Sequence, residues 1–193
     1  ASDISQTNEW DDAIIANYTS TSNPKDVQVV GITLTSAKRF GLYMYGGIVK
    51  ACIFKDNGTG YGYNFMWVNN TIIDSCTFEN NKSANLIVAQ SYNGWNAHAK
   101  TIIKNSVFKN NLQNINSDGG LINFGYSQDV FVQNSLFYKN TGGNIFTFGG
   151  DGGNTGTSAV NNDSAFISNC LVYNNKATVG MFKTWERRDG GTF

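Results

Sequence analysis

The chain of 193 residues has few charged side chains, one proline, one histidine and three cysteines. Charged residues make up 15% of it, and 14 basic and 14 acidic side chains give a formal net charge of zero. Such a chain lacks the basic surface by which proteins bind nucleic acid. The widely spaced Cys52, Cys76 and Cys170 do not have the pairing of a disulfide framework or a zinc site. No run of 18 apolar residues occurs, so no membrane-spanning helix is expected.

The usual catalytic and cofactor motifs are also missing. No P-loop, nucleophile elbow, His-Glu-x-x-His or Cys-x-x-Cys motif is present. The glycine-rich stretch at residues 149–154 faintly resembles a calcium turn, but it has one acid, whereas Ca²⁺ takes about six to eight oxygen ligands. We therefore expect no cofactor and no metal, and the sequence leans away from an enzyme without deciding the question.

Asparagine, glycine and aromatic residues are abundant instead. The chain has 27 Asn and 21 Gly, and 13% of its residues are aromatic. Asn and Gly favour turns and left-handed backbone conformations. The apolar share of 40% is enough for the core of one domain. These features predict a single all-β domain that is rich in turns.

A ten-residue segment recurs five times, and most copies end in Phe-x-x-Asn. The copies are residues 48–57, 72–81, 102–111, 131–140 and 166–175, and a weaker sixth copy lies around residues 29–34. Their anchor residues are separated by 24, 30, 29 and 35 positions. A constant segment at a variable spacing predicts a fixed structural coil with connecting loops of different lengths.

Each aligned position predicts a column of stacked side chains. The anchor column predicts an interior stack of Phe54, Phe78, Phe108 and Phe137, with Val172 in the last copy. The Asn column predicts side chains that bond to each other and to the turn backbone, and it contains Asn57, Asn81, Asn111, Asn140 and Asn175. A column of small residues, Cys52, Cys76, Ser106, Ser135 and Cys170, indicates a tight inward corner. Buried free thiols at Cys52 and Cys76 are favoured over a disulfide.

Charges alternate in two further columns of the same alignment. One column has Lys50, Asp74 and Lys104, and the other has Lys55, Glu79 and Lys109. Neighbouring strands lie about 4.8 Å apart, so like charges would repel and opposite charges would pair. The alternation supports coils that are stacked in register.

The predicted fold is an all-β, right-handed parallel β-helix, a solenoid of about six coils. The right hand is assumed because about 98% of parallel crossovers have it. We expect one domain over residues 1–193, with an N-terminal cap at 1–27 and coils over 28–193. A short capping helix is expected at residues 5–16. Residues 189–193 are typical of the start of another strand, so the chain is also compatible with a piece of a longer solenoid.

The Phe-x-x-Asn repeat, with Gly46-Gly47-Ile48 and Gly119-Gly120-Leu121, resembles the polymorphic outer-membrane-protein repeats and related adhesin-like proteins. These belong to the pectin-lyase-like class of right-handed β-helices. The resemblance covers residues 28–193, and Val172 with Asn175 departs from it by lacking the Phe. It implies an extracellular or cell-surface location and a role in adhesion. It carries over no catalytic residue, because the motif residues are structural.

Three hypotheses for function follow. The first is a non-enzymatic attachment module whose partners are surface glycans or proteins of a partner cell. The second is a polysaccharide-binding or polysaccharide-degrading protein, which as an enzyme would need two carboxylates about 5–10 Å apart. The third is a fibre-forming scaffold that associates end to end at the C-terminal edge.

The predicted binding residues lie in a polar loop and are Tyr92, Trp95 and His98. Trp67 is expected in the wall or core and Trp185 near the C-terminal end. Four further acids lie in or near loops, where the sequence cannot bring them together: Asp118, Asp129, Asp151 and Asp163.

Overall fold

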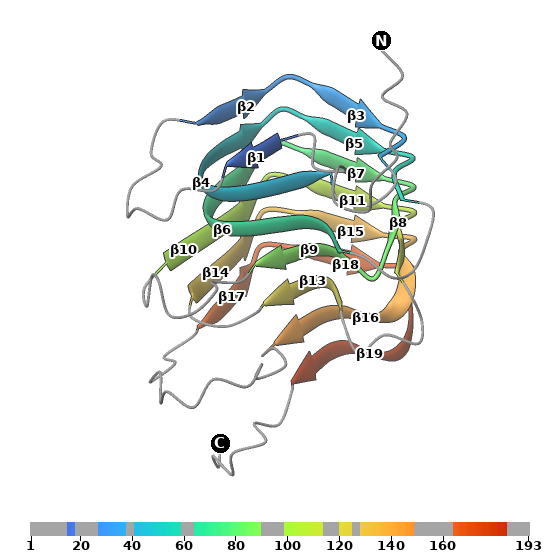
Figure 1. Cartoon of the computed structure of the whole chain (residues 1–193). Helices are drawn as coiled ribbons and strands as arrows, with labels where there is room; N and C mark the ends of the chain where they lie inside the picture. The colour runs from blue at the N-terminus through green and yellow to red at the C-terminus, as the bar shows by residue number, and fades with distance from the viewer. Residues whose placement is uncertain are drawn as a thin grey trace, which may run out of the picture.

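The described part of the chain consists of strands that pair in parallel (Figure 1). The computed structural model describes residues 15–17, 27–37, 41–58, 64–89, 99–113, 120–124, 128–148 and 164–184. Within these ranges no helix is long and apolar enough to cross a membrane. The prediction of an all-β, parallel structure is confirmed.

The strands form two sheets, and the larger one has 13 strands. Its strands are β1 (Ile15–Asn17), β2 (Gln28–Val30), β4 (Leu42–Lys50), β6 (Asn64–Asp74), β8 (Lys82–Ser83), β9 (Asn85–Ala89), β10 (Ala99–Lys104), β12 (Leu112–Gln113), β13 (Gly120–Phe124), β14 (Gln128–Gln133), β16 (Thr141–Phe148), β17 (Ala165–Ser168) and β19 (Lys176–Thr184). The smaller sheet has β3 (Thr33–Thr35), β5 (Ile53–Lys55), β7 (Thr77–Glu79), β11 (Val107–Lys109), β15 (Leu136–Tyr138) and β18 (Leu171–Tyr173).

In each coil the chain passes from the larger sheet to the smaller sheet and back to the larger sheet (Figure 1). In the last coil, for example, it passes through β17, β18 and β19, which pair with β14, β15 and β16 of the coil before. β4 and β6 are long because each ends one coil and begins the next without a break in the strand. This arrangement is compatible with a β-helix or another parallel solenoid.

The predicted N-terminal helix at residues 5–16 is wrong where the structure describes it. Ile15–Asn17 forms β1, which pairs in parallel with Leu42–Met44 of β4. The backbone groups along the edge of β4 offer hydrogen-bond partners to an extended segment, and this tertiary pairing overrides a weak local preference for helix. Residues 5–14 and the strand expected at 189–193 lie outside the described residues.

The core runs through the coils as continuous columns of buried side chains. The rings of Phe54, Phe78, Phe108 and Phe137 stack at centroid distances of 5.0, 4.6 and 4.5 Å. A second column contains Val49, Ile73, Ile103 and Val132, and a third contains Leu42, Met66, Ile87, Ile122 and Phe146. Because each layer packs on the next, removal of one large side chain leaves a cavity in the middle of the stack.

Every coil turns two corners through a residue in the left-handed backbone conformation. At the first corner these residues have φ between 49° and 57° and are Ala51, Ser75, Asn105, Asn134 and Asn169. At the second corner φ lies between 52° and 56°, and the residues are Asp56, Asn80, Asn110, Lys139 and Asn174. Asn adopts this conformation more readily than most residues with a side chain. Repeated corners therefore account for much of the high Asn content.

Gly47 allows β4 to continue from one coil into the next. Its φ is 92°, and a Cβ atom at this position would overlap the carbonyl oxygen of Val27. The N–H of the next residue, Ile48, donates to that same oxygen at 2.9 Å. The Gly-Gly motif is thus needed for close approach of two backbones, which is a structural role.

Candidate binding surface

The Asn column is a closed internal hydrogen-bond ladder. The Nδ2 groups of Asn57, Asn81, Asn111 and Asn140 each donate to Oδ1 of the next Asn at 2.9 Å. Those of Asn81, Asn111, Asn140 and Asn175 also donate to the carbonyl of an anchor Phe, at 2.9–3.0 Å. The first four of the five residues in the ladder are buried. These amides serve the scaffold and are not available to a ligand.

The cysteines are buried or half-buried thiols with backbone partners. All three are free, as predicted for Cys52 and Cys76. The thiol of Cys52 donates to the carbonyls of Lys50 and Val29, at 3.2 and 3.4 Å. Burial raises the pKa of Cys76 to about 12, so its thiol stays protonated at neutral pH. A protonated, buried thiol is a poor nucleophile, and this site offers no cysteine chemistry.

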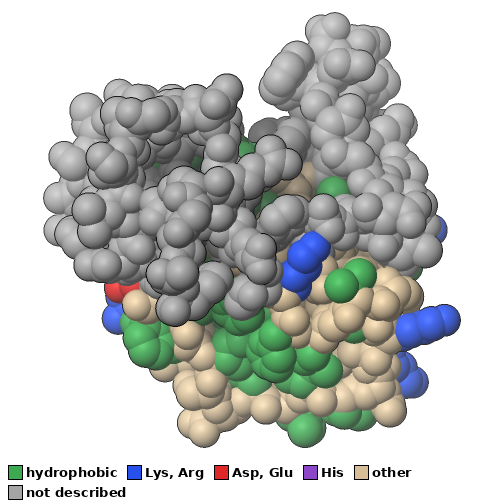
Figure 2. Space-filling model, turned by 90° about the horizontal axis from the view of Figure 1, so that it is seen from below, with side chains coloured by type: hydrophobic (Ala, Val, Ile, Leu, Met, Phe, Trp, Pro, Cys, Tyr) green, Lys and Arg blue, Asp and Glu red, His purple; other side chains and the backbone are tan. Residues whose placement is uncertain are grey.

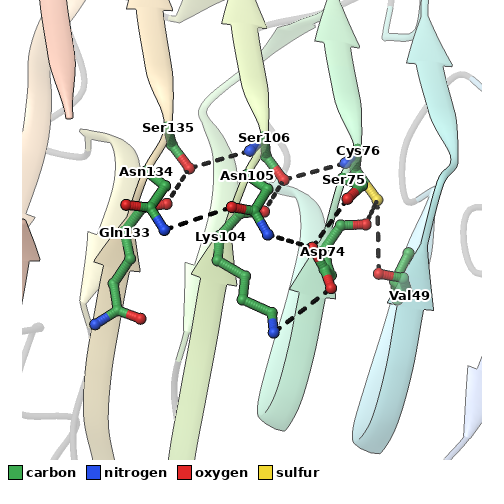
Figure 3. A network of polar contacts seen from close by, with 10 residues as sticks. All are labelled: Val49, Asp74, Ser75, Cys76, Lys104, Asn105, Ser106, Gln133, Asn134 and Ser135. Carbon is green, nitrogen blue, oxygen red and sulfur yellow. Dashed lines mark hydrogen bonds and ion pairs between the residues drawn. The ribbon is translucent and has the colours of Figure 1, made fainter. Parts of the chain in front are cut away.

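A polar network joins the first corners of neighbouring coils on the outer surface (Figure 3). The ammonium group of Lys104 lies 3.5 Å from the carboxylate of Asp74. Asp74 Oδ1 also accepts hydrogen bonds from Asn105 Nδ2 at 2.8 Å and Ser75 Oγ at 3.0 Å. At the second corner Lys109 pairs with Glu79 at 2.9 Å. These acids are paired with lysines of the next coil, as their alternation predicts, and they do not form a catalytic pair.

The network makes one stability contribution sensitive to acid. The hydrogen bond from Asn105, followed by weaker contributions from Ser75 and Lys104, holds the pKa of Asp74 below its ordinary value of 3.8, although partial desolvation opposes the shift. A lowered folded-state pKa adds stability above the unfolded value, and this stability is lost as the pH falls through the folded value. Asp74→Asn should therefore lower the free energy of unfolding in urea by up to about 1 kcal/mol at about pH 6, and by less at about pH 3. An equal difference at both pH values would contradict this.

The predicted binding residues Tyr92, Trp95 and His98 lie outside the described residues, as do Asp118, Asp151, Asp163 and Trp185. Asp129 is described, and its Oδ1 accepts a hydrogen bond from the N–H of Ser164 at 3.0 Å, which ties β14 to the start of the last coil. Strand β9 ends at Ala89, whose partner in β6 is Val68.

Three aromatic side chains gather on the outer face of β4 and β6. Tyr43 in β4 and Trp67 in β6 alternate along their strands with the fully buried Leu42, Met44 and Met66, so they lie on the side away from the core. The ring of Tyr43 lies 5.3 Å from that of Tyr45 and 6.0 Å from that of Trp67. These three rings form the outer aromatic cluster.

The outer aromatic cluster has both apolar and polar character. The hydroxyl groups of Tyr43 and Tyr45 are 3.2 Å apart, and Tyr43 and Trp67 are half-buried. The sequence predicts Trp67 in the wall or core, and the structure places it in the outer wall. The alternation Leu42-Tyr43-Met44-Tyr45 is the pattern that could have revealed the cluster, because in an isolated strand it assigns both tyrosines to one face.

Asn69 lies next to the cluster and has an unused acceptor. It is the register partner of Tyr45 in the neighbouring strand, and 1% of it is exposed. Its Oδ1 is buried and has no hydrogen-bond partner. Most buried acceptors are paired, and an unpaired one costs about 1–3 kcal/mol. The Oδ1 of Asn69 is therefore a buried, unpaired acceptor beside the outer aromatic cluster.

A second outward column is apolar but differs in geometry. It contains Ile48, Ile72, Ile102, Phe131 and Phe166. The rings of Phe131 and Phe166 stack face to face at 4.6 Å, and the ammonium group of Lys100 lies 4.2 Å from the centroid of Phe131. The ring faces of Phe131 and Phe166 are thus occupied by each other and by a lysine.

The described residues hold no group of three or more His, Cys, Asp or Glu that could bind a metal ion. No protein-family model, no curated protein and no solved structure matches the chain. The functional argument therefore depends on the outer surface, and the outer aromatic cluster with Asn69 is the candidate binding surface.

Proposed function

We propose that this protein is a right-handed β-helix module of a secreted or cell-surface protein, and that it mediates attachment without catalysing a reaction. The interior columns are occupied by packing and by hydrogen bonds of the scaffold itself. The acids at the outer corners, Asp74 and Glu79, pair with lysines of the next coil. The resemblance of the Phe-x-x-Asn repeat to adhesin-like β-helices supports the same function.

The observation that carries the proposal is the outer aromatic cluster beside the unpaired Oδ1 of Asn69. Aromatic rings with polar edges are common where one side of a contact is apolar and the other is hydrated. A saccharide offers both an apolar C–H face and hydroxyl donors, so a neutral surface glycan suits this cluster. Tyr92, Trp95 and His98 follow strand β9 in the sequence and are proposed as further contacts.

The proposal predicts glycan binding that depends on the cluster. Trp67→Ala should weaken binding on a glycan array by about tenfold or more, because the largest ring of the cluster is lost. Trp67→Phe keeps an aromatic ring and should retain part of the binding. Tyr173→Ala, which removes an exposed ring on β18, is the matched control and should bind as the wild type does.

The same protein should release no products from polysaccharides in a depolymerisation assay. Product release would favour the polysaccharide-degrading alternative. Equal loss of binding in Trp67→Ala and Tyr173→Ala, with both variants folded by circular dichroism, would remove the cluster from the proposal.

A further inference from the structure

The chain contains five Asn-x-Ser/Thr motifs, which are acceptors for N-linked glycosylation. Such an acceptor normally lies on the surface, because the attached oligosaccharide is bulky. Two of the five motifs coincide with the Asn ladder, and they are Asn57-Gly58-Thr59 and Asn81-Lys82-Ser83. The other three begin at Asn17, Asn69 and Asn162. At two corners, therefore, the acceptor nitrogen of the motif is the same amide nitrogen that the fold uses in the ladder.

The amides of Asn57 and Asn81 are closed off in the folded protein. Asn57 is 1% exposed and Asn81 is 0% exposed. Nδ2 of Asn57 donates to the carbonyl of Leu34 at 3.1 Å and to Oδ1 of Asn81 at 2.9 Å. Nδ2 of Asn81 donates to the carbonyl of Phe54 and to Oδ1 of Asn111, both at 2.9 Å. Both N–H bonds of each amide are thus used, and a transferase cannot reach either nitrogen once the coils have formed.

An attached sugar would not fit inside the coils. Neighbouring strands lie about 4.8 Å apart, so a sugar ring has no room between two hydrogen-bonded corners. The interior is packed, and apolar side chains gather in the middle of the described surface when the stack is seen from the side of β19 (Figure 2). Glycosylation would also leave Nδ2 of Asn81 with one N–H bond for two buried acceptors. A glycan at either ladder motif is therefore incompatible with closed coils.

Both acceptors stay accessible while the chain is being made. Asn57 is covered by Asn81, which is 24 residues later, and Asn81 is covered by Asn111, which is 30 residues later. At a synthesis rate of about 5–20 residues per second, each amide waits roughly 1–6 s for the next coil. During this interval an oligosaccharyltransferase can modify the unfolded acceptor wherever that enzyme is present.

We propose that Asn57 and Asn81 are N-glycosylation sites of the unfolded chain only, and that a glycan at either site prevents the coils from closing. In this reaction Nδ2 attacks the anomeric carbon of a lipid-pyrophosphate-linked oligosaccharide. The bond from Nδ2 to that carbon forms, the bond from the carbon to the pyrophosphate oxygen breaks, the lipid pyrophosphate leaves, and one Nδ2 proton is lost to water. The protein therefore folds where no oligosaccharyltransferase reaches these two sites. The inference does not rest on glycan recognition by the outer aromatic cluster.

The test uses the full chain behind a cleavable secretory signal peptide, translated into microsomes that contain oligosaccharyltransferase. Mass spectrometry of glycopeptides measures the occupancy of Asn57 and Asn81 in the total product and in the fraction that resists brief proteolysis after the membranes are opened. Occupancy should be at least about tenfold lower in the resistant fraction, because the glycan removes a buried hydrogen bond and displaces the core. Resistant protein that carries a glycan at either site would overturn the proposal, and so would the lack of a glycan at both sites in every fraction.

The neighbouring Asn80 provides the matched control, because it is exposed at the same corner and its Nδ2 bonds only to the exposed Asp56, at 3.1 Å. Lys82→Thr with Ser83→Ala moves the acceptor motif from Asn81 to Asn80, one residue away. A glycan at Asn80 should be equally frequent in the total product and in the resistant fraction, since it extends into solvent. If Asn80 occupancy falls in the resistant fraction as much as that of Asn81 does, any glycan at this corner blocks folding, and the role given to the ladder is wrong.

Discussion

Asn111→Ala is expected to lower the free energy of unfolding by about 3–5 kcal/mol. The side chain is buried in the middle of the Asn ladder. Its loss leaves the backbone N–H and the Nδ2 of Asn81 without their shared acceptor, and the carbonyl of Phe78 without its donor. One substitution thus removes a hydrogen bond from each of three buried polar groups, although Asn81 Nδ2 keeps its bond to the carbonyl of Phe54. Urea unfolding followed by circular dichroism measures the effect.

The neighbouring Asn110 provides the matched control. It is exposed and has a φ of 54°, a conformation that glycine adopts without strain. Asn110→Gly should therefore change the free energy of unfolding by no more than about 0.5–1 kcal/mol. If the two substitutions have equal effects, the ladder does not stabilise the coils as described.

Phe108→Ala is expected to be similarly destabilising, by about 3–5 kcal/mol. The ring of Phe108 is fully buried between those of Phe78 and Phe137, at centroid distances of 4.6 and 4.5 Å. Its removal opens a cavity that neighbouring coils cannot close, because both are fixed by strand pairing on either side. The midpoint of thermal or urea unfolding measures this loss.

Val172→Ala is the control for the aromatic column. Val172 is the last residue of the same column and is half-buried, so truncation removes fewer contacts and should cost about 1 kcal/mol. Equal destabilisation by Phe108→Ala and Val172→Ala would show that position in the stack does not matter.

These two large effects concern the scaffold, and they separate it from the proposed binding surface. Phe108 and Asn111 lie inside the coils, whereas Tyr43 and Trp67 lie on the outer face of β4 and β6. A variant of either scaffold residue that remains folded should bind glycans with unchanged affinity. Glycan binding and stability should thus vary independently, as expected when function resides in a site on a repeating fold.

The interior of the protein could be predicted from its sequence because repetition carries tertiary information. Equivalent residues of successive coils, such as Phe78 and Phe108, become neighbours whenever the coils stack in register. An aligned column in the sequence is therefore a list of contacts, and alternating charges test the register. The same logic gave the ion pairs of Asp74 with Lys104 and Glu79 with Lys109.

The corners were predicted only in part. The inward Asn of each second corner is clear in the alignment. The residue just before it, such as Asn110, differs in type from coil to coil, so the alignment does not reveal its conformation. Ala51, Ser75 and Asn105 share a left-handed conformation without sharing a side chain. The left-handed conformation at these positions is imposed by the path of the coil, and several residue types can adopt it.

By itself, the sequence determined the parallel coils, their register, the aromatic and Asn columns and the buried thiols, because each depends on contacts between equivalent positions. Tertiary structure alone decided that Ile15–Asn17 pairs with β4 as a strand, because the free edge of β4 outweighs a short local helix preference. It also decided that Tyr43, Tyr45 and Trp67 meet beside Asn69, whose Oδ1 is unpaired. These residues do not recur from coil to coil, so only the folding of β4 against β6 brings them together.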